Sequence, residues 1–311
     1  MRIKPCLLPS LRRFVASPYN PTMTATATIM DGKAVAAQVL AGAASRVQRI
    51  RDETGATPAL ATVLVGDDPA SRTYVRMKAA RCEAVGMRSQ RIELPALVDT
   101  AELVDSISSL GADPTVHGIL LQHPVPGHID ERAAFEAIRP EKDVDGVTVH
   151  SFGAMALGSA NRAGFTACTP AGIMRLLQAY GVALEGCHAV VVGRSAILGK
   201  PMAMMLLAAH ATVTICHSRT RQLPQIVQEA DLIVAAVGKP TVIRGAWVRE
   251  GAVVIDAGYN EGNVGDVEYD AAADRASMIT PVPGGVGPMT IATLIDQASI
   301  AAAQQLGVDD R

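Results

Sequence analysis

The sequence predicts an α/β protein with two domains built on parallel sheets, the second of them Rossmann-like. From about residue 29 onward, short apolar segments alternate with amphipathic helical segments, which is typical of parallel strands covered on both faces. The alternation pauses near residue 148 and then restarts. In the second series a glycine-rich turn joins an apolar strand to a helix, as in doubly wound nucleotide-binding sheets. We therefore assign residues 29–148 and 289–311 to the first domain and residues 149–288 to the second.

The composition fits a soluble globular protein, since 49% of the 311 residues are hydrophobic and 19% are charged. The net charge of -2 offers no basic field for nucleic acid or for an anionic membrane surface. The longest apolar run is about half the length that spans a bilayer. The 5 cysteines form no C-x-x-C pair, so we expect reduced thiols, a cytoplasmic location and no metal site.

Residues 1–28 differ from the rest because they contain Arg2, Lys4, Arg12 and Arg13 and no acidic residue. Leaders of this composition direct proteins to organelles, and an organellar location therefore stays open. We favour the simpler interpretation of a disordered extension, or of a true start at Met23.

The first series opens with a helix that Asp31 can cap and that ends near Gly55. Its apolar face consists of Val35, Val39, Ala43, Val47 and Ile50. A second helix, at residues 70–86, has Ser71 near its start and Gly86 beyond its end. The other segments are strands at 59–66, 90–94 and 116–122 and helices at 99–111 and 129–138.

The second series opens with a helix for which Thr169 is the expected cap, Pro170 the first helical residue and Gly181 the terminator. Strands follow at residues 188–193, 211–218, 231–238 and 251–258. The helices between them are expected at the glycine-rich turn and near 222–230. A closing helix covers roughly residues 290–306.

The glycine-rich turn reads "VVGRSAILGKPMAMML" from Val191. A nucleoside-triphosphate loop is excluded, because Gly193 and Gly199 are one residue too far apart and Pro201 replaces the magnesium-binding hydroxyl. A dinucleotide fingerprint fits better, with Ser195 in place of its second glycine. An ordinary strand-to-helix turn is the alternative, because a single glycine pattern is a weak signal.

The next strand ends in "CHSRT", where enzymes that bind NAD usually have an acidic residue for the ribose hydroxyls. Here Ser218 and Arg219 occupy the strand end, and Arg194 lies in the turn itself. Hydroxyls and cations suit a 2'-phosphate. The sequence therefore favours NADP over NAD.

A polar cluster is predicted in the first domain. Tyr74 and Lys78 form Y-x-x-x-K, which places both on one helical face. Short-chain dehydrogenases use this spacing, but there it follows the glycine motif, whereas here it precedes it. Gln122 ends a buried strand, where open α/β sheets bind ligands. Asp143 and Asp145 flank one valine near the domain junction, as a solvated turn or a metal loop would.

In combination these motifs resemble one family, the bifunctional methylenetetrahydrofolate dehydrogenase/methenyltetrahydrofolate cyclohydrolases. Each motif alone is weak, but all eight occur in one order across residues 29–306. They are "GDDPASRTYVRMK", "GILLQHPVP", "PEKDVDG", "FTACTPAGI", "VVGRSAILGKPMAMML", "CHSRT", "VIDAGYN" and "TPVPGGVGPMT".

The resemblance implies a folate cleft between the two domains and a role for each matching residue. Lys78 would be the central catalytic residue, positioned by Gln122. Tyr74 would stack on the pterin, and Asp145 would bind its amino-pyrimidine edge. The rest of the folate site would comprise Ser71 and the turn Pro283, Gly284 and Gly285, and the NADP site would comprise Thr169, Gly193, Arg194, Ser195, Ser218 and Arg219.

The implied chemistry is the NADP-dependent oxidation of 5,10-methylenetetrahydrofolate to the methenyl cation, followed by its hydrolysis to 10-formyltetrahydrofolate, a part of one-carbon metabolism. A homodimer through the cofactor domain is also implied. The family usually has leucine where this chain has His123, which we interpret as a tolerated neighbour of Gln122 that points away from it. His123-Pro124 and Val282-Pro283 are candidate cis peptide bonds. Cys168 is expected to be a buried structural thiol rather than a nucleophile.

Three alternatives remain at the level of sequence. A different two-domain NADP-dependent dehydrogenase, such as a shikimate-type enzyme, would share the second domain without needing the polar cluster. A folate or nucleotide binder without activity would not need Lys78 and Gln122 together. A dehydrogenase with weak or absent cyclohydrolase activity would lie within the same family.

Overall fold

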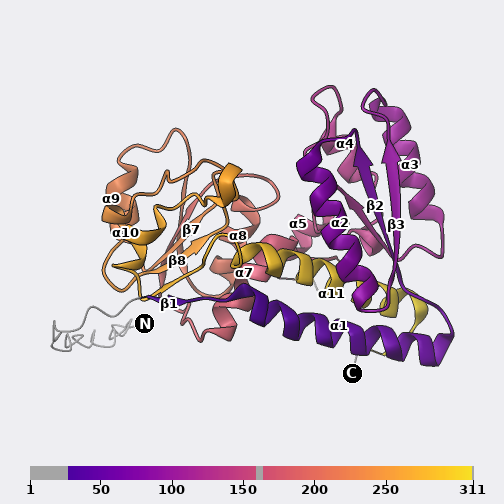
Figure 1. The fold of residues 1–311 in the computed structure, drawn as a ribbon, viewed down its shortest axis with the longest axis horizontal. Coiled ribbons are helices and arrows are strands. Elements are labelled where there is room, and N and C mark those ends of the chain that lie inside the picture. Colours follow the sequence, from indigo (N-terminus) through magenta and orange to yellow (C-terminus); the bar gives the residue numbers. More distant parts are fainter. Residues whose placement is uncertain (1–26, 159–163, 310–311) are drawn as a thin grey trace, which may run out of the picture.

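The computed structural model describes residues 27–158 and 164–309 and confirms the predicted α/β class. Figure 1 shows two lobes side by side, with the long helices α1 (Gly32–Thr54) and α11 (Val286–Leu306) extending from one lobe to the other. Every strand pair is parallel. Among the described residues, no helix is both long and apolar enough to cross a membrane.

The first lobe has a three-stranded sheet in the order β3-β2-β4, with β2 at Ala59–Val65, β3 at Arg88–Leu94 and β4 at Gly118–Leu121. One face packs against α1, α2 (Pro69–Ala84) and α11 through residues such as Leu120 and Ile295. The other face packs against α3 (Thr100–Ala112) and α4 (Glu131–Glu136) through residues such as Ile119 and Phe135. The predicted strands and helices of this lobe are therefore all present.

The second lobe has a six-stranded sheet in the order β1-β9-β8-β7-β5-β6. Helices α7 (Cys168–Ala179) and α8 (Gly199–Ala208) cover one face, and α9 (Leu223–Gln228) and α10 (Tyr269–Ala273) cover the other. Its strands are β1 (Thr28–Ile29), β5 (His188–Val192), β6 (Thr212–Cys216), β7 (Leu232–Ala235), β8 (Val253–Asp256) and β9 (Met278–Ile279). Because the chain passes from β6 across β5 to β7, the topological switch point lies between β5 and β7.

The described residues begin before the predicted boundary at residue 28. Ala27 is buried, and Thr28 pairs with Met278, so β1 joins the second sheet although it precedes the first lobe in the chain. The strands β1 and β9 have only two residues each, and the sequence analysis did not find them. It also missed helix α5 (Val149–Ala156). Of the leader or extension predicted at residues 1–28, residues 1–26 lie outside the described residues.

Helix boundaries follow the predicted caps at α1 but not at α7 or α11. Asp31 caps α1 and Gly55 ends it with a left-handed φ of 72°. The prediction that Thr169 caps α7 is wrong: the N-cap is Ala167, and the Thr169 hydroxyl accepts instead from Thr290 Oγ1 at 3.1 Å. Helix α11 begins at Val286, before the predicted residue 290, because Pro288 in the first helical turn needs no hydrogen-bond acceptor for its nitrogen.

Asp296 links helix α11 to α1 and α7 through ion pairs. Its carboxylate accepts from Arg46 of α1 at 2.8 Å and from Arg175 of α7 at 2.5 Å. These partners lie far apart in the sequence, and all three side chains are at least half-buried. The ion-pair network therefore fixes how α1 and α7 lie against the closing helix.

Candidate functional site

Lys78 and Gln122 are brought together by the first lobe. Helix α2 starts at the N-cap Asp68, which accepts from the Ser71 backbone N-H at 2.7 Å, and it carries Tyr74 and Lys78 one turn apart. Gln122 directly follows β4. Lys78 Nζ donates to Gln122 Oε1 at 3.0 Å, and Gln122 Nε2 donates to the His123 carbonyl at 2.7 Å. The oxygen and the nitrogen of the Gln122 amide therefore both have hydrogen-bond partners, which fixes the orientation of the amide toward Lys78.

The surroundings of Lys78 favour its neutral form. Burial lowers the pKa of Lys78, and the negative charge of Asp145 opposes that shift. The residue as a whole is partly exposed. A lysine in this setting can release and recover a proton closer to neutral pH than a free lysine can.

The two acids of the "PEKDVDG" segment have different functions in the structure. Asp143 is fully buried, and its carboxylate accepts from the Val147 and Thr148 backbone N-H groups at 3.1 and 3.0 Å and from the Thr148 hydroxyl at 2.7 Å. Asp145 is partly exposed near Lys78. Asp143 therefore builds the loop, and Asp145 is the carboxylate that stays partly exposed beside Lys78.

Cys168 lies against the same loop as a buried thiol, as the sequence analysis expected. Its Sγ donates to the Val144 carbonyl at 3.2 Å and accepts from Gln297 Nε2 at 3.3 Å. Burial, together with the charge of Asp145, raises the pKa of the thiol well above its ordinary value. Because the thiolate is the nucleophilic form, this environment disfavours a nucleophilic role for the cysteine.

The His123 ring faces α4 rather than α2. Its ring makes an edge-to-face contact with Phe135 of α4, with ring centroids 6.5 Å apart. Helix α4 covers the opposite face of the sheet from α2. The peptide bonds His123-Pro124 and Val282-Pro283 are both cis, which confirms that prediction.

Two further segments carry the predicted glycine turn and a tyrosine that contacts the first lobe. The turn before α11 places Gly284 at a φ of 113°, a conformation that favours glycine, and the Gly285 N-H donates to the Pro281 carbonyl at 2.9 Å. The loop after β8 contributes Tyr259, whose ring meets Tyr74 edge to face with centroids 5.9 Å apart and planes at 82°. The pKa of Tyr74 is raised by burial and by Tyr259. The sequence analysis quoted Tyr259 within a motif but gave it no role, because a single loop tyrosine has no diagnostic spacing.

The glycine-rich turn joins β5 to α8 at the switch point. Gly193 has a φ of 137°, and a Cβ there would lie 2.1 Å from the Ala236 carbonyl oxygen. A Cβ on Gly199 would lie 2.3 Å from the Gly193 carbonyl oxygen. The Ser195 hydroxyl accepts from the Leu198 and Gly199 backbone N-H groups at 3.2 and 3.3 Å. Only a chain without side chains at both glycines can turn this tightly.

The other predicted cofactor residues divide into two places. Ser218 and Arg219 are exposed just beyond β6, the strand beside β5, so they and the exposed Arg194 lie at one edge of the sheet. Thr169 lies in the first turn of α7, and its described hydrogen bond is with Thr290 of α11. The tight glycine backbone at a helix N-terminus, with hydroxyls and guanidinium groups at the neighbouring strand, fits a dinucleotide phosphate.

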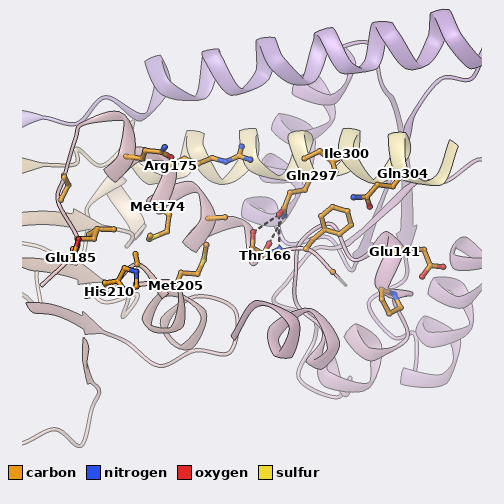
Figure 2. A pocket seen from close by; sticks show the side chains of 18 residues that line it. Glu141, Thr166, Met174, Arg175, Glu185, Met205, His210, Gln297, Ile300 and Gln304 are labelled. Atoms are coloured by element: carbon orange, nitrogen blue, oxygen red, sulfur yellow. Dashed lines mark hydrogen bonds between the residues drawn. The ribbon is translucent and has the colours of Figure 1, made fainter. Parts of the chain in front are cut away.

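A separate hollow of about 1090 Å³ lies between α7, the end of α8 and α11. Figure 2 shows Arg175, Met174, Glu185 and His210 along one part of it and Glu141 and Gln304 along another. The hydrogen bonds between Thr166 and Gln297 lie at its centre. Its lining includes neither Lys78 nor Gln122 nor Asp145, so this hollow is not the candidate catalytic site. Within residues 27–158 and 164–309, no group of His, Cys, Asp or Glu is arranged to hold a metal ion.

Two family models match the chain and together cover most of it. Residues 30–145 match the catalytic domain of the tetrahydrofolate dehydrogenase/cyclohydrolases, and residues 167–306 match their NAD(P)-binding domain. The second match ends with α11, which packs against both lobes. The matched regions contain every candidate site residue named above.

Known proteins show the same similarity over nearly their whole length. The protein "Bifunctional protein FolD 1" of Streptomyces avermitilis is 65% identical over 285 residues, which are 92% of this chain and 98% of that protein. A FolD methylenetetrahydrofolate dehydrogenase/cyclohydrolase from Campylobacter jejuni superposes with a TM-score of 0.86 at 43% identity, covering 89% of this chain and 99% of that one. The Trypanosoma brucei enzyme, solved with NADP and an inhibitor, has a TM-score of 0.85 at 36% identity, covering 89% and 98%.

Proposed function

The chain belongs to the tetrahydrofolate dehydrogenase/cyclohydrolase family, and on that premise we propose how its residues share the two reactions. The enzyme oxidises 5,10-methylenetetrahydrofolate to 5,10-methenyltetrahydrofolate with NADP and then hydrolyses that product to 10-formyltetrahydrofolate. The observation that carries the proposal is the Lys78-Gln122 hydrogen bond beside Asp145, on the helix whose Tyr74 contacts Tyr259 of the second lobe.

The folate lies between the lobes in this proposal. Tyr74 stacks on the pterin ring, and the Asp145 carboxylate accepts N-H bonds from the amino-pyrimidine edge. Gly284 and Gly285 let the backbone of the second lobe approach the substrate from the other side. Ser71, a buried residue whose backbone N-H is bonded to Asp68, supports the start of α2 beneath Tyr74.

NADP lies at the carboxyl edge of the second sheet in this proposal. The backbone between Gly193 and Gly199, with Arg194 and Ser195, holds the pyrophosphate, because a Cβ at either glycine would fill the space that the turn needs. Ser218 and Arg219 bind the 2'-phosphate, and Thr169 lines the approach from α7. When bound, NADP supplies the hydride acceptor.

Lys78 moves the protons of the hydrolytic step. Its lowered pKa increases the share of unprotonated amine, which accepts a proton from the attacking water. When the ring opens, the resulting ammonium protonates the leaving ring nitrogen and the hydroxyl proton of the intermediate passes to water, so that one proton is released overall. Gln122 keeps Nζ in place, because its amide is held by the His123 carbonyl at the far end. A cationic methenyl substrate next to Lys78 lowers the pKa of the amine further.

The two lobes divide these tasks in the proposal. Residues 29–148, with the closing helix, form the folate-binding catalytic domain, and residues 149–288 form the NADP-binding domain. The family matches at 30–145 and 167–306 support a boundary near residue 148, but they count the closing helix with the NAD(P)-binding domain; β1 and α11 each join the two parts.

Replacing Arg219 with alanine is expected to raise KM for NADP at least about tenfold and to change KM for NAD by less than about twofold. The guanidinium would be lost from the 2'-phosphate, which NAD lacks. Initial rates with each cofactor give both constants. Arg244→Ala, at another exposed arginine, is the matched control. An equal loss with both cofactors would contradict the assignment of Arg219.

We propose further that the chain forms a homodimer through the second lobe. Strand β6 is an edge strand, and Ile215 on it is exposed. Helix α8 packs beside β6 and exposes Leu207, and α5, in contact with α8, ends at the exposed Leu157. Apolar side chains next to an unpaired strand edge favour association.

Sedimentation equilibrium is expected to give twice the chain mass for the wild type and a single chain mass for Ile215→Lys. Leu97→Lys, at an exposed leucine in the first lobe, is the matched control and should remain dimeric. A monomeric wild type would exclude the proposed homodimer.

A further inference from the structure

Two buried carboxylates in the second lobe, Asp256 and Asp266, have no part in the function described above. Asp256 is the last residue of β8, and Asp266 lies ten residues further along the chain. Their exposed fractions are 2% and 0%. Burying two carboxylates costs free energy unless hydrogen bonds satisfy them. The hydrogen-bond partners of Asp256 and Asp266 therefore show which parts of the chain these carboxylates hold in place.

Asp266 holds three consecutive backbone N-H groups. Its Oδ2 accepts from Val237 and Gly238 at 2.6 and 2.9 Å, and its Oδ1 accepts from Lys239 at 2.9 Å. Oδ1 also accepts from Asn260 Nδ2 at 3.1 Å. The segment 237–239 has no helix or strand of its own, so this one carboxylate supplies the acceptors that regular secondary structure would otherwise provide.

Asp256 in turn fixes Asp266. Its Oδ1 accepts from the Gly258 and Asp266 backbone N-H groups at 2.9 and 3.0 Å, and its Oδ2 accepts from Val267 at 2.9 Å. A Cβ on Gly258 would lie 2.2 Å from Asp266 Cγ, and one on Gly265 would lie 1.9 Å from Asp256 Oδ2. The two carboxylates and the loop around them therefore form one closely packed unit.

The segment that Asp266 holds lies at the cofactor edge of the sheet. It directly follows β7, the neighbour of β5 at the switch point, and the Ala236 carbonyl lies against Gly193 of the glycine-rich turn. With its N-H groups turned inward to Asp266, the segment leaves Val237, Gly238 and Lys239 exposed at this edge. The segment therefore lines the region beside the glycine-rich turn, where the dinucleotide is proposed to bind.

We propose that Asp266 is a positioning residue for NADP: it keeps the segment 237–239 in the shape that completes the cofactor site. This inference rests on the proposed location of NADP. Hydrolysis of methenyltetrahydrofolate consumes no cofactor, so the two activities of the enzyme separate an effect on the cofactor site from general damage. Loss of the three hydrogen bonds affects the binding of NADP, while the Lys78-Gln122 pair in the other lobe makes no contact with Asp266.

The test is Asp266→Asn, in which one acceptor oxygen becomes an N-H donor that faces backbone N-H groups. KM for NADP is expected to rise about tenfold or more, with kcat less affected. Hydrolysis of added methenyltetrahydrofolate, without cofactor, should stay within about twofold of the wild type. Asp274→Asn, at an exposed aspartate beyond α10, is the matched control.

A second variant decides the question if Asp266→Asn does not fold. Gly238 is exposed, has a φ of 67° and has no atoms within 4 Å of an added Cβ, so Gly238→Ala strains the segment without touching either carboxylate. It too should raise KM for NADP and spare hydrolysis. An unchanged KM for NADP, or an equal fall of both activities in the folded variants, would overturn the proposal. A wild type that hydrolyses the methenyl substrate but reduces no NADP would contradict the proposed function instead.

Discussion

Replacing Lys78 with alanine is expected to lower the rate of methenyltetrahydrofolate hydrolysis by about 100-fold or more. The Nζ atom is the proton-transferring group of the proposed mechanism, held 3.0 Å from the fixed Gln122 amide oxygen. The variant should lose less of the NADP-dependent oxidation, because that step transfers a hydride to the cofactor. Stopped assays of each step, started from its own substrate, measure the two rates separately.

The pH dependence supplies a second readout for Lys78. Since burial lowers the pKa of Lys78, the wild-type hydrolysis rate should rise with pH through that lowered pKa, as the ammonium becomes an amine. The rise should vanish in Lys78→Ala. His123→Leu is the matched control, because the His123 ring lies against Phe135 and should leave the rate within about twofold. Unchanged hydrolysis in Lys78→Ala would exclude Lys78 as the proton-transferring residue.

Replacing Asp145 with alanine is expected to raise KM for both folate substrates by about 100-fold, with KM for NADP unchanged. The carboxylate is the proposed acceptor for the amino-pyrimidine edge, and both reactions use that contact. Its charge also raises the pKa of Lys78, so its loss should move the rising part of the hydrolysis profile to lower pH. Initial rates over a range of folate concentrations and pH values measure both effects.

Replacing Asp143 is expected to have a different effect from replacing Asp145. The Asp143 carboxylate accepts three hydrogen bonds inside its own loop, so Asp143→Asn should lower the melting temperature rather than the affinity for folate. Asp105→Ala, at an exposed aspartate of α3, is the control for a change of net charge. A normal KM for folate in Asp145→Ala would remove Asp145 from the substrate site.

The elements that the sequence predicted well are those whose signals are local. Helix α1 has a cap, an apolar stripe and a terminating glycine within one segment, and the prediction from Asp31 to Gly55 is confirmed. The predicted start of α7 was wrong. Threonine often caps helices, but α7 begins before Thr169, and the Thr169 hydroxyl contacts Thr290 instead. The two-residue strands β1 and β9 have no periodic pattern to detect and exist through pairing with distant residues.

The site residues also divide into those with a local sequence signal and those without one. Lys78 and Gln122 each belong to a recognisable motif, but their contact depends on how α2 packs against the first sheet, which the sequence does not specify residue by residue. Tyr259 reaches Tyr74 from the other lobe through a loop without a spacing rule. The partners of Asp266 are backbone N-H groups, which every residue but proline has, so no side-chain pattern reveals them.

One assay tests most directly that a single chain performs both reactions. Purified protein is mixed with 5,10-methylenetetrahydrofolate and NADP, and absorbance follows reduced cofactor and methenyltetrahydrofolate separately. The proposed mechanism predicts that reduced cofactor forms while methenyltetrahydrofolate does not accumulate, because Lys78 and Gln122 promote its hydrolysis. Accumulation of the methenyl compound would contradict the cyclohydrolase role of this site. Failure to reduce either NADP or NAD would contradict the dehydrogenase assignment as well.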